Sequence, residues 1–129
     1  MVTILVVDYD ESTRRVFKHI LVKRGFSVHE AKDGEEAIRK MKTIRYDAVL
    51  LSFELPDMHG IDLLFFLKKS VPNALKIITA GFSSLDRGIQ AVEAGADAYF
   101  AKPVDPEKLI LVIEEELREE RNKLPTHYN

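Results

Sequence analysis

The sequence has no cysteine and no tryptophan, and its apolar runs are short. Without cysteine the chain cannot form a disulfide, a thiolate metal site or a cysteine nucleophile. No apolar run approaches the roughly 20 residues that a membrane span needs. Residues Met1 to Ile4 show neither the basic stretch nor the small-residue cleavage site of a signal peptide. We therefore expect a cytoplasmic protein that does not contact a membrane.

The chain also lacks an excess of charge of either sign. It has 19 basic and 21 acidic residues, which give a formal net charge of −2. Proteins that grip nucleic acid usually carry a basic excess, so we expect no nucleic-acid binding by this domain. A length of 129 residues fits one domain with a buried core. We assign residues 1–122 to this domain and residues 123–129 to a C-terminal tail that could begin a linker.

Short runs of apolar and β-branched residues alternate with segments of helical periodicity. The apolar runs predict strands over residues 3–7, 26–31, 47–51, 75–80 and 98–101. The periodic segments predict helices over residues 10–25, 34–44, 61–70, 84–94 and 106–121. Alternation of strand and helix is typical of an α/β fold with three layers, in which a doubly wound parallel sheet lies between two layers of helices.

Capping residues precede several of these helices. Asp10 stands at the N-cap position of the first helix. Ser83 and Asp86 have the spacing of a capping box. Asp105 and Pro106 occupy the N-cap and N1 positions of the last helix, which both residue types favour. The sequence therefore predicts where these helices begin as well as that they form.

Polar side chains follow the predicted strands at one edge of the sheet. Asp8 follows the first strand, and Ser52, Thr79 and Lys102 end the third, fourth and fifth. The carboxyl ends of parallel strands meet at one edge, where open α/β sheets bind their ligands. An acid, a hydroxyl and a lysine together suit an oxyanion or a metal-bound phosphate. Each residue alone is an ordinary polar strand end, but the group predicts a functional site.

Six short motifs, taken in order and spacing, resemble the receiver domain of two-component response regulators. They are Ile4-Leu5-Val6-Val7-Asp8, Ala31-Lys32-Asp33-Gly34-Glu35-Glu36-Ala37, Leu55-Pro56-Asp57-Met58-His59-Gly60, Thr79-Ala80, Glu93-Ala94-Gly95-Ala96-Asp97 and Lys102-Pro103. The resemblance extends from about Ile4 to Leu117. It implies a flavodoxin-like (βα)5 fold with strand order 2-1-3-4-5 and a role in two-component signal transduction through a phosphorelay.

The resemblance also implies roles for single residues. In the family, two acids after strand one hold a magnesium ion, and an aspartate ending strand three accepts a phosphoryl group from a histidine kinase. A hydroxyl and a lysine contact the phosphate, and an aromatic residue on strand five changes rotamer. By position, Asp8 matches the first acid, Thr79 the hydroxyl, Lys102 the lysine and Tyr99 the aromatic residue. The peptide bond between Lys102 and Pro103 is expected to be cis, as is common in receiver domains.

Two positions depart from the family pattern. Tyr9 stands where the second acid is expected, and Ser52 stands where the phosphoacceptor aspartate is expected. A carboxylate is already an anion, whereas a serine hydroxyl must lose its proton to become a good nucleophile. Magnesium prefers carboxylates and water, and of the usual pocket carboxylates Asp8 alone remains. We therefore expect no cofactor, and weak or absent magnesium binding.

Two further acids lie near this edge and could supply metal ligands. Asp10 is better explained as the N-cap of the first helix, and Glu54 as a solvated loop residue. We expect Lys102 to pair permanently with Asp8, with Ser52 as a hydrogen-bond neighbour, because a cation left unpaired in a partly buried edge is costly.

These departures favour an atypical receiver, or pseudo-receiver, that acts through protein contacts without aspartate phosphorylation. Such a domain is an interaction module and not an enzyme. The family's contact surface corresponds here to residues 84–94, 98–101 and 106–121, which would bind a protein partner or a second copy of the chain. An effector domain could follow in a longer protein.

Three alternatives stay open at this point. Ser52 or a nearby acid could be a non-standard phosphoacceptor that works with metal help. Ser52 could instead be an engineered replacement of aspartate in a normal receiver, although Tyr9 argues against a single designed change. The pocket could also serve as an anion or small-molecule sensor that uses Lys102, Thr79 and Ser52.

Overall fold

The structure is a computed structural model that describes the backbone of residues 1–81 and 85–126 and the side chains of residues 1–81 and 86–118. The strands are β1 (Thr3–Val7), β2 (Ser27–Ala31), β3 (Ala48–Ser52), β4 (Leu75–Ala80) and β5 (Ala98–Ala101). The helices are α1 (Glu11–Lys23), α2 (Gly34–Met41), α3 (Gly60–Ser70), α4 (Leu85–Glu93) and α5 (Pro106–Thr126). The described elements alternate strictly between strand and helix, as the sequence predicts.

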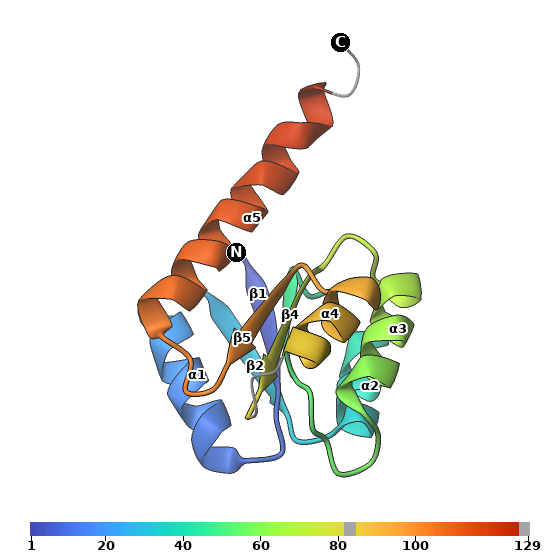
Figure 1. The fold of residues 1–129 in the computed structure, drawn as a ribbon. Coiled ribbons are helices and arrows are strands. Elements are labelled where there is room, and N and C mark those ends of the chain that lie inside the picture. The colour runs from blue at the N-terminus through green and yellow to red at the C-terminus, as the bar shows by residue number, and fades with distance from the viewer. Residues whose placement is uncertain (82–84, 127–129) are drawn as a thin grey trace.

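All strand pairs are parallel, and the sheet order is β2-β1-β3-β4-β5. Helices α1 and α5 cover one face of the sheet, and α2, α3 and α4 cover the other (Figure 1). This is the flavodoxin-like α/β fold with the predicted strand order. The predicted cis bond between Lys102 and Pro103 is also present.

Each face of the sheet has its own apolar core. Alternate β1 residues enter the two cores, so Leu5 packs under α2, α3 and α4 while Ile4 packs under α1 and α5. Every residue of β3 and β4 is buried. Strands covered by helices on both faces must be apolar almost throughout, which explains why these runs stand out in the sequence.

Helix α1 ends at Lys23 and α4 at Glu93, within two residues of the prediction, and the larger differences are at the C-terminal ends of α2 and α5. Helix α2 ends at Met41 and not at residue 44, because Lys42 and Thr43 donate their backbone N–H groups to carbonyls three residues back. Helix α5 continues to Thr126, so the predicted end at residue 121 is too early and residues 123–126 are helical. The Glu, Arg and Lys residues that follow Ile113 are strong helix formers. The assignment of residues 123–129 to a tail beyond the domain stays a prediction.

Two further observations complete the fold. The cap assigned to Ser83 lies outside the described residues. Within the described part of the chain, we find no helix with both the length and the apolar character required to cross a membrane.

Candidate functional site

The carboxyl edge of the sheet brings together the predicted site residues. Asp8 follows β1, Ser52 ends β3 and Thr79 lies on β4, directly opposite Ser52 in the sheet register. These three polar side chains are buried. Lys102 follows β5, and its backbone N–H donates to the carbonyl of Ala80 at 2.7 Å. Buried polar groups need partners, so the bonds that each makes define what the site can do.

Asp8 and Lys102 form the predicted ion pair. Lys102 Nζ lies 2.7 Å from Asp8 Oδ2, and the Asp8 side chain is only 6% exposed. The second carboxylate oxygen, Oδ1, accepts the backbone N–H of Asp10 at 2.9 Å. Both oxygens of the buried carboxylate are therefore engaged by the chain itself.

Ser52 is bonded differently from the prediction. Its hydroxyl donates to the backbone carbonyl of Glu54 at 3.1 Å, so the expectation that it neighbours Lys102 and Asp8 through a hydrogen bond is wrong. The chain bends after β3, where the N–H of Phe53 donates to the carbonyl of Thr79 at 2.7 Å. This bend presents the Glu54 carbonyl to the Ser52 hydroxyl, a local bond that serine commonly makes in turns.

The two nearby acids are engaged elsewhere. Asp10 caps α1, accepting the Thr13 hydroxyl at 2.6 Å and the Thr13 backbone N–H at 3.0 Å. Both hydrogen bonds lower the pKa of Asp10, and the bond from the Thr13 hydroxyl has the larger effect. Glu54 forms an ion pair with Arg87 of α4 and is not simply solvated.

The donors present do not fit the magnesium site of the family. Among the described residues at this edge, Asp8 is the buried carboxylate, and it is paired with Lys102. Tyr9 replaces the second acid, and its side chain is largely exposed. Within the described residues, no three acidic or histidine side chains lie close enough together to hold a metal ion. Magnesium requires near-octahedral oxygen ligands, which this arrangement does not offer.

Tyr99 lies beneath α4. It is half-buried and packs against the core between the sheet and α2, α3 and α4. A Cβ atom built on Gly88 would lie 3.8 Å from the Tyr99 ring, so α4 approaches the tyrosine at a residue without a side chain. Tyr99, which matches the aromatic residue of the family by position, therefore lies directly against α4.

The loop after β3 contains three contacts that the sequence did not reveal. Arg87 stacks over the Phe53 ring, with 4.7 Å between the guanidinium carbon and the ring centre. The Asp57 carboxylate accepts the backbone N–H groups of Gly34 at 3.0 Å and Glu35 at 2.9 Å, which caps α2 from another segment of the chain. Such contacts join loops distant in sequence and leave no periodic signal.

Gly60 allows this loop to return close to β3. A Cβ atom at this position would lie 2.5 Å from the Ser52 carbonyl oxygen and 2.7 Å from Phe53 Cα. Both neighbours are backbone atoms that cannot move aside easily. The glycine in the Leu55–Gly60 motif is therefore required by close packing against the site loop.

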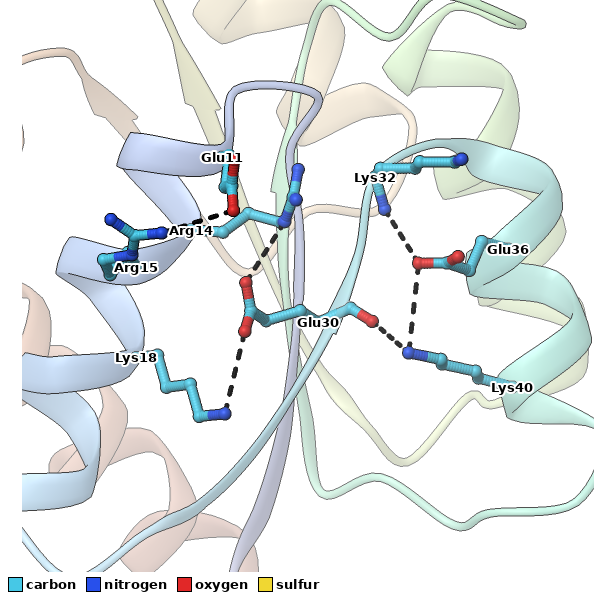
Figure 2. A pocket seen from close by; sticks show the side chains of 8 residues that line it. All are labelled: Glu11, Arg14, Arg15, Lys18, Glu30, Lys32, Glu36 and Lys40. Carbon is cyan, nitrogen blue, oxygen red and sulfur yellow. Dashed lines mark hydrogen bonds and ion pairs between the residues drawn. The ribbon is translucent and has the colours of Figure 1, made fainter.

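A separate cavity of about 490 Å³ lies between α1, β2 and α2. Figure 2 shows Glu30 on β2 contacting Arg14 and Lys18 on one side, with Lys40 reaching its backbone carbonyl from α2. Charged groups line this cavity, and its carboxylates already pair with its cations. We interpret it as an ion-pair network that covers the outer edge of β2 and not as a ligand site.

Comparison with known proteins agrees with this geometry. The model of the response regulator receiver domain matches residues 4–114. The chain belongs to this family. The crystal structure of a receiver domain protein from Methanospirillum hungatei JF-1 is similar to this receiver domain, with a TM-score of 0.90 and 35% identity, covering 95% of this chain and 98% of that one. A receiver domain from Clostridium thermocellum gives a TM-score of 0.86 and 30% identity, covering 96% and 98%.

A curated relative is longer than this receiver domain. The transcriptional regulatory protein SrrA of Staphylococcus aureus (strain NCTC 8325 / PS 47) is 33% identical over 115 residues, which are 89% of this chain and 47% of that protein. The chain therefore spans about half the length of the curated relatives it matches.

Proposed function

We propose that this receiver domain works without aspartate phosphorylation and signals through protein contacts. The observation that carries the proposal is the place of Ser52, which ends β3 opposite Thr79 where the family has its phosphoacceptor aspartate. Its hydroxyl donates to the Glu54 carbonyl, and an amide carbonyl accepts a hydrogen bond but does not take the proton away. Within the described part of the chain, no hydrogen bond joins this hydroxyl to a carboxylate or histidine that could act as its base.

The state of Lys102 supports the same proposal. Its ammonium already neutralises Asp8 at 2.7 Å, in a partly buried position. An incoming phosphoryl group would have to displace this partner and leave a buried carboxylate without its counter-charge. The same competition disfavours the anion-sensor alternative, since the cation that would bind the anion is occupied.

The proposed contact surface is formed by α4, β5 and the first part of α5, and we call it the α4–β5–α5 face. It carries exposed apolar side chains on α4, Ile89 at 46% and Val92 at 63%. Ile89 and Val92 are three residues apart and therefore share one side of the helix. Exposed apolar groups gathered at one place are typical of protein interaction sites.

Phosphoryl transfer and metal binding test the proposal together. We expect that acetyl phosphate with millimolar magnesium leaves the mass of the intact chain unchanged, and that magnesium causes weak or no NMR shifts at Asp8. The control is the double variant Tyr9→Asp, Ser52→Asp, which restores two carboxylates to the pocket and should both bind magnesium and gain a phosphoryl group.

Two outcomes would contradict the proposal. One is a phosphoryl adduct on the unaltered chain, mapped by peptide mass spectrometry to Ser52 or to a nearby acid, which would favour the non-standard phosphoacceptor. The other is magnesium binding by the unaltered chain that is as tight as binding by the double variant.

A further inference from the structure

Helix α4 contacts the loop after β3 through one long side chain. Arg87 forms an ion pair with Glu54 and stacks over Phe53 at 4.7 Å from the ring centre. Phe53 and Glu54 are the two residues that directly follow Ser52. A single arginine on α4 thus touches both residues that connect the phosphoacceptor position to the rest of the loop.

The same two residues organise the edge of the pocket. The Phe53 N–H donates to the Thr79 carbonyl at 2.7 Å, and the Glu54 carbonyl accepts the Ser52 hydroxyl at 3.1 Å. The side chains of Phe53 and Glu54 face α4, while their backbone groups hold the pocket residues. Phe53 and Glu54 therefore link α4 to Ser52 and Thr79 through a short chain of contacts.

Among the described side chains of residues 86–94, small residues make the contacts of α4 with the core. Ala91 and Ala94 are buried there, and Gly88 lies against Tyr99 without a side chain of its own. Small residues bury little apolar area, so each contributes little to holding the helix in place. Arg87 adds an ion pair and a ring contact with the loop after β3 to these small-residue contacts.

We propose that Arg87 is a positioning residue that couples the placement of α4 to the pocket loop. The contact with Phe53 and Glu54 holds α4 against the site, and losing it releases both the helix and the Ser52–Glu54 bond. Coupling between two places is reciprocal, so a partner that displaces α4 alters the pocket to the same degree. That last consequence, regulation by a partner, rests on the proposed function, whereas the coupling itself does not.

The geometry suits a reversible contact. The Arg87 and Glu54 side chains are 32% and 52% exposed, so solvent weakens their attraction. An arginine over an aromatic ring adds a second, modest attraction. Two modest contacts made by one side chain hold α4 in place. They still allow α4 to move when a partner forms stronger contacts with the helix.

Amide hydrogen exchange on the isolated chain tests the coupling. Arg87→Met keeps the apolar stem and removes the charge, and Glu54→Gln removes the carboxylate while keeping its shape. We expect each variant to speed exchange over residues 85–93 by about 3- to 10-fold, as expected from the loss of one partly exposed ion pair with its ring contact. The combined variant should exchange no faster than Arg87→Met alone, because both changes break the same contact.

The matched control is another exposed ion pair. Arg15 and Glu11 on α1 are 3.3 Å apart and 76% and 73% exposed, so Arg15→Met and Glu11→Gln remove a similar pair that touches neither α4 nor the pocket. These variants should leave exchange in α4 unchanged. The NMR amide shifts of Ser52 and Lys102 should change in Arg87→Met and stay constant in Arg15→Met.

Two results would overturn the inference. Unchanged exchange over residues 85–93 in Arg87→Met would show that the contact does not hold α4. Faster exchange in α4 with unaltered shifts at Ser52 would show a contact that does not reach the pocket. Neither measurement uses a phosphodonor, a metal or a partner. A failure of this inference is therefore distinguishable from a failure of the proposed function.

Discussion

At the scale of single residues, the pocket depends on the pairing of Lys102 with Asp8. Asp8 is 4% exposed, so its carboxylate relies on the Lys102 ammonium and the Asp10 N–H in place of water. Removing one member of such a pair leaves a buried charge without its partner, which destabilises more than the pair itself stabilises. Because Lys102 is already paired with Asp8, its ammonium has a counter-charge without an external anion.

We expect Lys102→Met to lower the free energy of unfolding by about 1–3 kcal/mol, since Asp8 would keep its burial and lose its counter-charge. Urea denaturation at neutral pH measures this. Adding Asp8→Asn to the same chain should recover part of the loss, because the buried group is then uncharged. A Lys102→Met variant as stable as the parent would show that the pair is not needed.

At the scale of elements, the loop after β3 is fastened to its neighbours by side chains. Asp57 caps α2 through the N–H groups of Gly34 and Glu35, while Arg87 joins α4 to Phe53 and Glu54. One loop therefore sets the position of two helices on the same face of the sheet. Two predictions concern elements on this side of the molecule.

The first concerns the cap on α2. Burial raises the pKa of Asp57, but hydrogen bonds from the N–H groups of Gly34 and Glu35 lower it by more, so its pKa lies below the usual 3.8. A lowered pKa in the folded chain means that the carboxylate stabilises fully above pH 3.8 and that this contribution is lost as the pH falls below it. We expect Asp57→Ala to lower stability by about 1 kcal/mol at neutral pH.

The pH dependence is a separate check on the Asp57 cap. The difference in unfolding free energy between the parent and Asp57→Ala should shrink as the pH falls from about 4 towards 2, in urea titrations at each pH. Glu35→Ala is the control, because that side chain is exposed beside the cap. A difference that stays constant across this range would mean that the charge of Asp57 does not support the helix.

The second element-scale prediction concerns the outer edge of β2. Glu36 accepts the Lys32 N–H at 3.1 Å, and Lys40 donates to the Glu30 carbonyl, so side chains of α2 occupy backbone groups that face away from β1 (Figure 2). Exposed strand edges tend to pair with other chains. We expect Glu36→Met with Lys40→Met, which removes both side-chain hydrogen-bonding groups, to increase self-association, measured by light scattering over a range of concentrations.

Glu35→Met with Lys42→Met is the matched control for that experiment, since both side chains are exposed on α2 or just after it. It removes the same charges and should leave the molecular mass unchanged. Equal association of the two double variants would attribute the effect to lost charge and not to the uncovered edge.

At the scale of the whole molecule, the proposed α4–β5–α5 face differs from the surface where α1 meets α5. Helices α1 and α5 are joined by Arg24, which lies 3.0 Å from Glu107 and 3.7 Å from Glu114. The proposed α4–β5–α5 face instead leaves Ile89 and Val92 exposed on α4. We expect Val92→Glu to abolish retention of the partner, or of a second copy, when the intact chain is used as bait in an extract of the source cell.

Val16→Glu is the control for that experiment, because Val16 is 56% exposed on α1 and lies outside the proposed face. Protein bands retained by the parent and by Val16→Glu but not by Val92→Glu would support the face. Protein bands that are lost with Val16→Glu but kept with Val92→Glu would show that the partner binds α1 and not the proposed face.

The sequence alone determined the strands, the helices and the edge at which the site forms. Strands buried on both faces must be apolar, so β1, β3 and β4 are visible as short apolar runs. Parallel strands place their carboxyl ends together, so Asp8, Ser52 and Lys102 could be assigned to one edge before any coordinates were known. The sequence also shows the two positions that depart from the family pattern, Tyr9 and Ser52.

The tertiary structure alone decided how the loops connect these residues. The bond of Ser52 to Glu54, the contact of Arg87 with Phe53 and the capping of α2 by Asp57 each join groups placed by chain bends. Hydrophobic periodicity reports which face of an element is buried, and it carries no information on where a loop side chain finds its partner. Loop partners are selected by directional hydrogen bonds and charges in three dimensions, so only the folded chain could show them.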